Sequence, residues 1–206
     1  MESYRVVETF LSFQGEGLHI GRRAFFIRLF GCNVKCAWCD SKYAWKGVCR
    51  ECLDVAELVG RAAESRAEIV VITGGEPCLH DLSPLLSGLA EVGIKCHLET
   101  SGTSPIIEKD TARFDWVALS PKLFMPPCED SLLRADELKM IVSDAAEIPN
   151  YVAIAERAEN ASALWLEPEW SKADDVGLLR AISDFVVARG GRYRAGWQMH
   201  KNYFVR

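Results

Sequence analysis

Hydrophobic and polar positions divide the chain into short apolar segments that alternate with segments of helical periodicity. The apolar segments are β-branched or otherwise apolar runs too short for helices, so they predict strands at residues 24–30, 69–73, 94–98, 116–119, 138–142 and 164–166. The periodic segments predict helices at residues 55–67, 82–92, 145–158 and 176–189. Asp54 and Asp81 are candidate N-caps of the first two helices, and Gly190 ends the last one. Pro149 falls inside the third.

Strands and helices that alternate with short connections predict parallel βαβ units. The chain has fewer of these units than a complete eight-fold barrel needs, so we expect an α/β fold with an open, partial barrel. Its 206 residues suit a single domain spanning residues 1–206. The tail, residues 195–206, mixes aromatic and cationic residues, and we expect it to fold back over the open side and close the site there.

Charge and cysteine content restrict the classes of function. A net charge of −5 argues against a general nucleic-acid or membrane-surface binder. The first residues show no secretion signal, and no apolar run reaches the length of a membrane span. Eight cysteines in such a chain are typical of metal ligands or buried thiols rather than disulfides. We therefore expect a cytoplasmic protein in a reducing compartment.

The unusual polar residues fall directly after predicted strands. The loop with Cys32, Cys36 and Cys39 follows the first strand, and the segment 74–77, Gly-Gly-Glu-Pro, follows the second. The segment 99–102, Glu-Thr-Ser-Gly, follows the third strand, and 120–122, Ser-Pro-Lys, follows the fourth. Parallel α/β folds bind ligands beyond the carboxyl ends of their strands, so these four loops predict one site.

Three cysteines within eight residues are the strongest chemical signal. Iron–sulfur clusters are usually held by four thiolates, so a trio leaves one iron with a position for another ligand. A zinc site is a second interpretation, because Cys49 and Cys52 could supply further ligands. Inert core thiols and a redox dithiol are further alternatives. The spacing by itself leaves them open, as it leaves open whether Gly-Gly-Glu-Pro is an ordinary β-turn.

The cysteine spacing together with Thr73-Gly74-Gly75-Glu76-Pro77 resembles the radical S-adenosylmethionine (radical SAM) superfamily. This resemblance implies a partial radical SAM βα barrel. It also implies a [4Fe–4S] cluster bound by Cys32, Cys36 and Cys39, with the amino and carboxylate groups of SAM on the fourth iron. An electron from the cluster then cleaves SAM to a 5′-deoxyadenosyl radical.

More narrowly, the chain is similar to the 7-carboxy-7-deazaguanine synthase (QueE) family. The matching segments run along most of the chain: 13–17 (Phe-Gln-Gly-Glu-Gly), 28–33, 38–41 (Trp-Cys-Asp-Ser), 73–77, 99–102, 120–122, 137–139 (Glu-Leu-Lys) and 198–201. The implied reaction converts 6-carboxy-5,6,7,8-tetrahydropterin into 7-carboxy-7-deazaguanine and ammonia by a radical ring contraction, in queuosine and 7-deazapurine biosynthesis. A glycyl-radical enzyme activase and a non-catalytic zinc- or cluster-binding module remain as alternatives.

The family resemblance assigns expected roles to individual residues. SAM would contact Trp38, Cys39, Asp40, Gly75, Glu76, Ser120, Pro121, Lys122 and Glu167, and Mg²⁺ would bind the Ser41 hydroxyl. The pterin would contact Phe13, Gln14, Gly15, Glu16, Arg28, Thr73, Glu99, His200 and Arg206. Carboxylates can accept paired N–H donors from a guanidine-like ring edge, and an arginine can bind a carboxylate with two hydrogen bonds. The family also implies a flavodoxin- or ferredoxin-type electron donor and a homodimer.

Two positions depart from the family pattern. Glu167 stands before Pro168 where many relatives have glutamine, and the chain ends in Arg206 where a relative ends in proline. Among the other cysteines, Cys78 and Cys96 are predicted to be small buried hydrophobic residues. The pair Cys49 and Cys52 has no predicted role in this interpretation.

Overall fold

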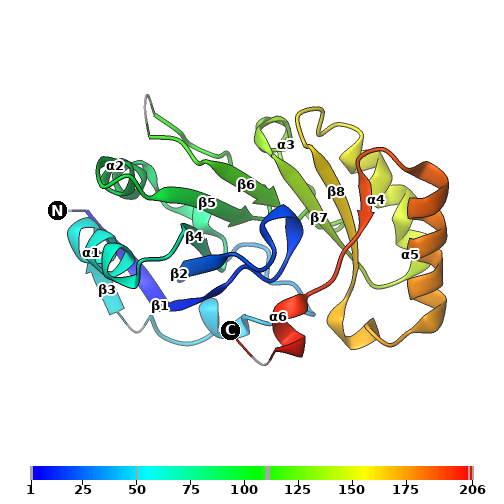
Figure 1. The fold of residues 1–206 in the computed structure, drawn as a ribbon, viewed down its shortest axis with the longest axis horizontal. Helices are drawn as coiled ribbons and strands as arrows, with labels where there is room; N and C mark the ends of the chain where they lie inside the picture. Colours follow the sequence, from blue (N-terminus) through cyan, green and yellow to red (C-terminus); the bar gives the residue numbers. More distant parts are fainter. Residues whose placement is uncertain (1, 50, 110–111, 204, 206) are drawn as a thin grey trace.

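The computed structural model describes residues 2–49, 51–109, 112–203 and 205. Within these residues the strands are β1 (Ser3–Phe13), β2 (Arg23–Leu29), β3 (Glu51–Asp54), β4 (Ile69–Gly74), β5 (Lys95–Thr100), β6 (Trp116–Leu119), β7 (Glu137–Val142), β8 (Ala163–Pro168) and β9 (Tyr193–Ala195). They form one sheet in the order β3-β1-β2-β4-β5-β6-β7-β8-β9 (Figure 1). β1 pairs antiparallel with β2 and β3, and the pairings from β2 to β9 are parallel. The sheet has two separate edges, so the prediction of an open α/β barrel is confirmed.

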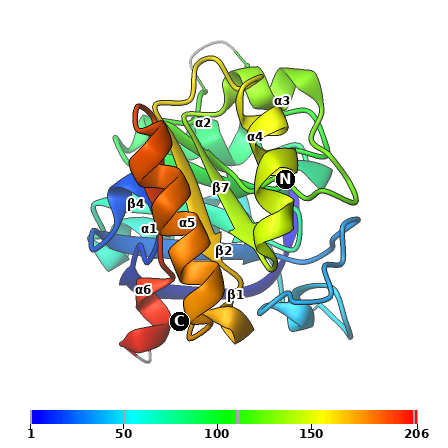
Figure 2. The same ribbon diagram turned by 90° about the vertical axis from the view of Figure 1, so that its right-hand side faces the viewer.

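The longer helices pack against the two halves of this sheet. They are α1 (Val55–Ser65), α2 (Ser83–Glu91), α3 (Glu129–Arg134), α4 (Ile148–Ala155), α5 (Val176–Arg189) and the short α6 (Met199–Asn202). α1 and α2 share a buried core with β1–β5, and Figure 2 shows α4 and α5 together on the half formed by β6–β9. Burial of apolar surface in these two clusters is the main force that holds the layers together.

The predicted elements all form, with small shifts at their ends. Asp54 caps α1 by accepting a hydrogen bond from the Glu57 backbone N–H at 2.9 Å. Asp81 accepts from the Ser83 N–H at 3.0 Å, but Leu82 is the N-cap and α2 begins at Ser83, so the predicted start at residue 82 is one residue early. The predicted helix 145–158 is a 3₁₀ turn followed by the shorter α4. Pro149 fits there because it lies in the first turn of α4, where its missing N–H costs nothing.

Five strands and α-helices were not predicted: β1, β3, α3, β9 and α6. In β1 the side chains do not alternate cleanly between buried and exposed, and its pairing with β2 shifts register between Val6 and Glu8. β3, α3, β9 and α6 contain only 4, 6, 3 and 4 residues, too few to establish a periodicity. β1 nevertheless matters for the site, because the segment that follows it enters the barrel.

The loop between β1 and β2 is anchored at the amino ends of the parallel strands. Glu137, at the start of β7, accepts hydrogen bonds from the indole N–H groups of Trp116 at 2.9 Å and Trp165 at 2.7 Å. It also accepts from the Leu18 backbone N–H at 2.9 Å. These bonds give the buried Glu137 carboxylate its hydrogen-bond donors. They also hold the β1–β2 loop in place, and this loop carries Gln14 and Glu16 toward the other end of the barrel.

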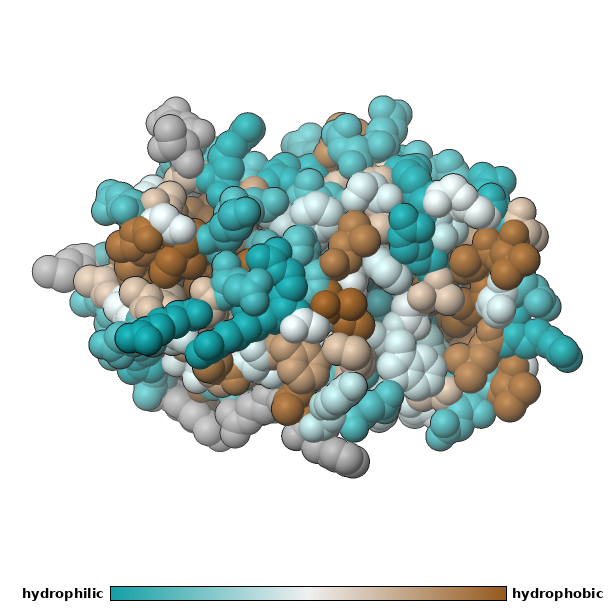
Figure 3. All heavy atoms as spheres, in the orientation of Figure 1, coloured by the Kyte–Doolittle hydropathy of each residue, from teal (hydrophilic) through white to brown (hydrophobic). Residues whose placement is uncertain are grey.

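The surface is mixed in character. The face shown in Figure 3 carries hydrophilic side chains interspersed with smaller hydrophobic groups. None of the helices in the described residues combines the length and the apolar character needed to cross a membrane.

Candidate active site at the carboxyl ends of the strands

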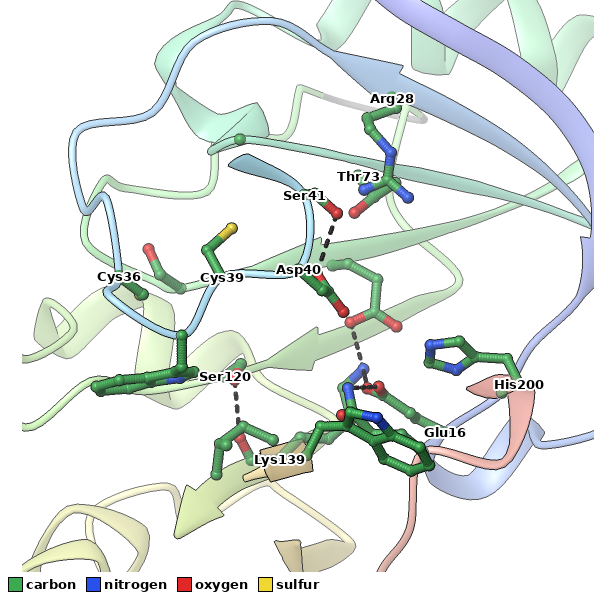
Figure 4. A pocket seen from close by; sticks show the side chains of 18 of the residues that line it. Glu16, Arg28, Cys36, Cys39, Asp40, Ser41, Thr73, Ser120, Lys139 and His200 are labelled. Carbon is green, nitrogen blue, oxygen red and sulfur yellow. Dashed lines mark hydrogen bonds and ion pairs between the residues drawn. The ribbon is translucent and has the colours of Figure 1, made fainter. Parts of the chain in front are cut away.

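A cavity of about 280 Å³ lies at the carboxyl ends of the parallel strands. Its walls come from the four loops that the sequence singled out, together with the β1–β2 loop and α6. Figure 4 shows Cys36 and Cys39 on one side of it and Glu16 and His200 on the other, with Asp40 between them. The strand ends therefore bring together residues that are distant in sequence, as parallel sheets do.

At the cysteine end, two loops meet through their backbones. The Glu76 backbone N–H donates to the Gly31 carbonyl at 2.8 Å, and the Gly75 N–H donates to the Leu29 carbonyl at 3.1 Å. A Cβ at Gly75 would lie 2.0 Å from the Gly31 oxygen and 2.8 Å from the Cys32 Cβ. A glycine is therefore required for this contact, because any larger residue would push the cysteine loop away.

Lys122 and Ser120 lie beside the cysteines. The buried Lys122 ammonium donates to the Ser120 hydroxyl at 2.6 Å and to the Ser120 carbonyl at 2.8 Å, and the Ser120 hydroxyl donates to the Lys139 carbonyl at 2.9 Å. Burial raises the pKa of the Cys36 thiol, and the nearby Lys122 charge opposes that rise. A fixed cation close to the thiols suits the binding of anionic groups at this end.

At the opposite end, charged side chains contact one another. The Lys139 ammonium donates to Glu16 Oε2 at 2.8 Å and to Glu99 Oε2 at 2.5 Å. Gln14 donates to the other Glu99 oxygen at 3.0 Å, and Gln198 donates to the other Glu16 oxygen at 2.7 Å. The result is a continuous polar network, Gln14–Glu99–Lys139–Glu16–Gln198, which we call the polar end.

A second cation lies on the β2 and β4 side of the cavity. Parallel pairing sets Arg28 opposite Thr73, and Figure 4 shows both near Ser41. Arg28 Nε donates to Glu8 at 3.0 Å, and its guanidinium lies over the Phe10 ring. The Ser41 hydroxyl donates to Asp40 at 3.0 Å. Arg28 is thus oriented at the cavity wall, where an anionic group of a ligand could meet it.

The tail contacts the β1–β2 loop and the cysteine loop. The Met199 N–H donates to the Gly15 carbonyl at 3.0 Å, and a Cβ on Gly15 would lie 2.3 Å from His200 Nδ1. Lys201 lies 3.4 Å from the Asp40 carboxylate and over the Trp170 ring. These contacts place α6 against the same cavity.

Most of the residues predicted for the site line this one cavity. They are Phe13, Gln14, Gly15, Glu16, Arg28, Cys32, Cys36, Trp38, Cys39, Asp40, Ser41, Thr73, Gly75, Glu99, Ser120, Lys122 and His200. Glu76, Pro121 and Glu167 do not line it. Arg206 lies outside the residues that the structure describes.

Glu76 and Glu167 are both buried, but they differ in their hydrogen bonds. The Glu76 carboxylate accepts hydrogen bonds from the Thr100 hydroxyl at 2.6 Å, the Ser101 N–H at 2.8 Å and the Cys78 N–H at 3.0 Å. Its oxygens therefore connect two loops of the chain. Both Glu167 oxygens have no hydrogen-bond partner among the described residues, and burial raises the pKa of Glu167 well above its ordinary value.

Several lining residues received no predicted role. Lys139 and Gln198 lie in the motif segments 137–139 and 198–201, so the motifs located them but did not indicate what they contact. Phe10, Phe26, Trp45, Ile141 and Trp170 add apolar walls. Phe10, Phe26 and Ile141 lie in strands, where an apolar residue is predicted to belong to the core, and Trp45 and Trp170 lie at 3₁₀ turns without a motif of their own.

Comparison with known proteins connects this geometry to a family. Residues 26–124 match the radical SAM superfamily. The chain is 39% identical over 204 residues to 7-carboxy-7-deazaguanine synthase of Synechocystis sp., covering 99% of this chain and 94% of that one. The chain belongs to the 7-carboxy-7-deazaguanine synthase family. The synthase of Escherichia coli (strain K12) is 37% identical over 169 residues, or 70% of this chain and 74% of that one.

A solved structure of this family has the same fold. The crystal structure of QueE from Escherichia coli superposes with a TM-score of 0.81 at 32% identity, covering 96% of this chain and 95% of that chain. The match includes the open sheet described above. Neither the activase alternative nor the binding-module alternative is favoured by these relatives, which carry the synthase name.

The residues present suit the cofactors of a radical SAM synthase. In the described part of the chain, no group of three or more His, Cys, Asp or Glu residues is placed to hold a single metal ion. The cysteines of a [4Fe–4S] cluster bind different irons, so they need to share a pocket wall rather than converge on one atom. Cys32, Cys36 and Cys39 do share that wall, with Gly75 leaving space and Lys122 supplying positive charge beside them.

Proposed function

We propose that this chain is the radical SAM enzyme that converts 6-carboxy-5,6,7,8-tetrahydropterin into 7-carboxy-7-deazaguanine and ammonia. The single observation that carries the proposal is the cavity that joins the cysteine trio to the polar end. One end suits a cluster with SAM, and the other offers two carboxylates to a ring rich in N–H donors. The named relatives support the same reaction.

Cys32, Cys36 and Cys39 would hold the [4Fe–4S] cluster, and SAM would bind between them and Ser120, Lys122, Trp38, Asp40 and Gly75. When bound, these cofactors supply the radical that abstracts hydrogen from the pterin. The protein's own contribution is to orient the pterin and to exclude water. Glu76, which is bonded inside the chain, would shape the Gly75 loop rather than touch the cofactor. Pro121 and Glu167 also lie outside the cavity lining, so direct SAM contact from them is not part of the proposal.

Glu16 and Glu99 would accept hydrogen bonds from the 2-amino-pyrimidine edge of the pterin, with Gln14 beside them. Arg28 and Thr73 face the cavity from adjacent strands and would bind the pterin carboxylate. Mg²⁺ would join the Ser41 hydroxyl to that carboxylate, with water completing its shell. Phe13, Gly15 and His200 would close the polar end, together with the rest of the 195–206 tail.

The same proposal includes an electron donor, an assembly state and a location. Asn33, Lys35 and Ala37 of the cysteine loop are exposed, and an external flavodoxin- or ferredoxin-type protein would deliver electrons at this loop. The family resemblance supports a homodimer. All eight cysteines are free, which fits a reducing cytoplasm.

An anaerobic assay tests the reaction. The reconstituted protein, given SAM, a reductant and the carboxy-tetrahydropterin, is expected to form the deazaguanine product. Cys36→Ala should abolish the product and lower the iron content, because it removes one cluster ligand. Cys128→Ala is the matched control and should retain both, since Cys128 lies outside the cavity and donates to Ser131. Pterin binding without turnover in the parent protein would contradict the proposal.

A further inference from the structure

Lys139 is a buried cation at the junction of the polar end. It lies in β7, its side chain is 4% exposed, and it pairs with residues 123 and 40 positions away, Glu16 and Glu99. Its ammonium makes charge-assisted bonds of 2.8 and 2.5 Å to one oxygen of each carboxylate. Glu16 and Glu99 are thus connected through one atom, Lys139 Nζ, and all three residues line the cavity.

Without that cation, the two carboxylates could not both stay ionised this close together, and one of them would take up a proton. Like charges in a buried site repel each other, and removal of one partner of a buried ion pair is strongly destabilising. Burial tends to raise the pKa of Glu16, but Lys139, together with the Gln198 hydrogen bond and the His200 charge, outweighs burial and lowers the pKa to about 2. For Glu99 burial prevails over Lys139, and its pKa is raised. Lys139 itself stays charged, because the surrounding carboxylates raise its pKa against the effect of burial.

The remaining oxygens of the pair are fixed by neutral donors. Gln14 donates to Glu99 Oε1 and Gln198 donates to Glu16 Oε1. Each oxygen thus already has one donor from the chain and one lone pair to spare, which sets the direction from which a ligand N–H can approach. The Gln14 and Gln198 amides hold the two Oε1 atoms, and Lys139 sets the spacing between the two carboxylates.

A third carboxylate shows that the pairing is selective. Glu167 is fully buried, and its pKa responds to Lys139, Glu16 and Glu99. Its oxygens nevertheless have no hydrogen-bond partner among the described residues, whereas the Lys139 bonds go to Glu16 and Glu99. The ammonium is therefore directed at the two carboxylates that line the cavity.

We propose that Lys139 is a positioning residue for ligand recognition. It holds Glu16 and Glu99 at the spacing at which they accept two adjacent N–H donors of a planar, guanidine-like ring edge. This inference rests on the proposed function for the identity of the ligand, the pterin. The inference goes further than the proposed function, because it assigns selectivity for that ring edge to Lys139, which acts through Glu16 and Glu99.

Equilibrium binding in the absence of turnover tests the proposal. The reconstituted protein is dialysed anaerobically against the carboxy-tetrahydropterin with SAM present and reductant omitted. Lys139→Met is expected to weaken pterin binding by about 10- to 100-fold. This is the range for losing charge-assisted hydrogen bonds, here those from the pterin to the displaced carboxylates. SAM binding, followed through the cluster spectrum, should change by less than about twofold. Lys95→Met, an exposed lysine in β5, is the matched control and should change neither.

A double-mutant cycle separates positioning from direct contact. In a Glu99→Gln background the carboxylates no longer repel, so Lys139→Met should weaken pterin binding by less than about threefold. The same 10- to 100-fold loss in both backgrounds would mean that Lys139 contacts the ligand itself and would overturn the proposal. A loss of SAM binding with pterin binding unchanged would overturn it as well.

Lys139→Arg covers the case in which Lys139→Met does not fold. It keeps the buried charge, but its forked head cannot occupy the same point between two carboxylates. We expect pterin binding about fivefold weaker or more, with normal SAM binding; unchanged pterin binding contradicts the positioning role. If the parent protein binds no pterin, the proposed function and this inference both fail. If parent and variants bind pterin equally, only the inference fails.

Discussion

At the cysteine end of the cavity, backbone groups of two loops contact each other, whereas at the polar end charged side chains from distant strands do so. The Gly75 and Glu76 N–H groups bond to carbonyls of the segment that leads into the cysteines. The Lys139 ammonium instead bonds to side chains of the β1–β2 loop and of β5. The cysteine end depends on Gly75 having no side chain, and the polar end depends on the balance of charge among several side chains.

This difference has functional meaning under the proposed reaction. A cluster and SAM present the same groups to every superfamily member, so a fixed backbone cradle suits them. The pterin edge is specific to one reaction, and a side-chain network can be tuned to it. We therefore expect changes at the cysteine end to affect folding and cofactor loading together, and changes at the polar end to affect mainly substrate binding.

The largest expected effect is at Gly75. Gly75→Ala places a Cβ 2.0 Å from the Gly31 oxygen, a backbone atom that cannot move without displacing the cysteine loop. Overpacking of this kind should lower the free energy of unfolding by about 3 kcal/mol. It should also reduce iron content after reconstitution. Denaturant unfolding and iron analysis measure the two effects.

Gly60 provides the matched control for that substitution. Nothing lies within 4 Å of a Cβ built on Gly60, in the middle of α1. Gly60→Ala should raise the free energy of unfolding by about 0.5–1 kcal/mol and leave iron content unchanged, since alanine favours the helix. If Gly75→Ala were as stable as the parent, the cysteine end would not depend on backbone packing.

The cysteine end could be predicted from sequence because its information is local. The spacing of Cys32, Cys36 and Cys39 and the adjacent glycines of 74–77 signal their chemistry within a few residues. The parallel strands then follow from hydrophobic runs, and their carboxyl ends meet by topology. The fold class and most of the cavity lining could therefore be predicted from the sequence.

At the polar end, Gln14, Glu16 and Glu99 were predicted as site residues, but the network that connects them through Lys139 and Gln198 was not. Lys139 lies between apolar residues of β7, and its local sequence does not indicate that it pairs with Glu16, which is 123 positions away. Side-chain pairing across a barrel depends on which strands become neighbours and on their register. The β1 strand, which delivers Gln14 and Glu16, was not predicted because its side chains do not alternate cleanly between buried and exposed.

Glu167 offers a test of charge balance at the polar end. Glu167→Gln should raise the free energy of unfolding by about 1–2 kcal/mol at pH 7, because a buried carboxyl without partners is replaced by a neutral amide of equal size. Because folding raises the pKa of Glu167 above its ordinary value of 4.5, the parent loses stability as pH rises above 4.5. The advantage of the glutamine variant should therefore widen with pH.

Denaturant unfolding between pH 5 and pH 8 measures this trend. Glu159→Gln, an exposed glutamate, is the control and should change stability by less than about 0.5 kcal/mol at each pH. A gap between parent and Glu167→Gln that stays constant with pH would show that the carboxyl is not held in its protonated form. The polar end would then contain an additional charge that Lys139 has to balance.

The smallest effect is expected where the tail joins the polar end. Gln198→Ala removes the 2.7 Å hydrogen bond to Glu16, while the Met199 N–H still bonds to Gly15 and keeps α6 in place. The lost bond to a charged acceptor should raise KM for the pterin about 5- to 10-fold with little change in kcat, iron content or SAM binding. Asn202→Ala, exposed in the same helix, should leave KM unchanged. Steady-state kinetics measure this effect. A fall in kcat with unchanged KM would mean that the tail acts on the cofactor rather than on substrate binding. The two ends of the cavity would then not have separate functions.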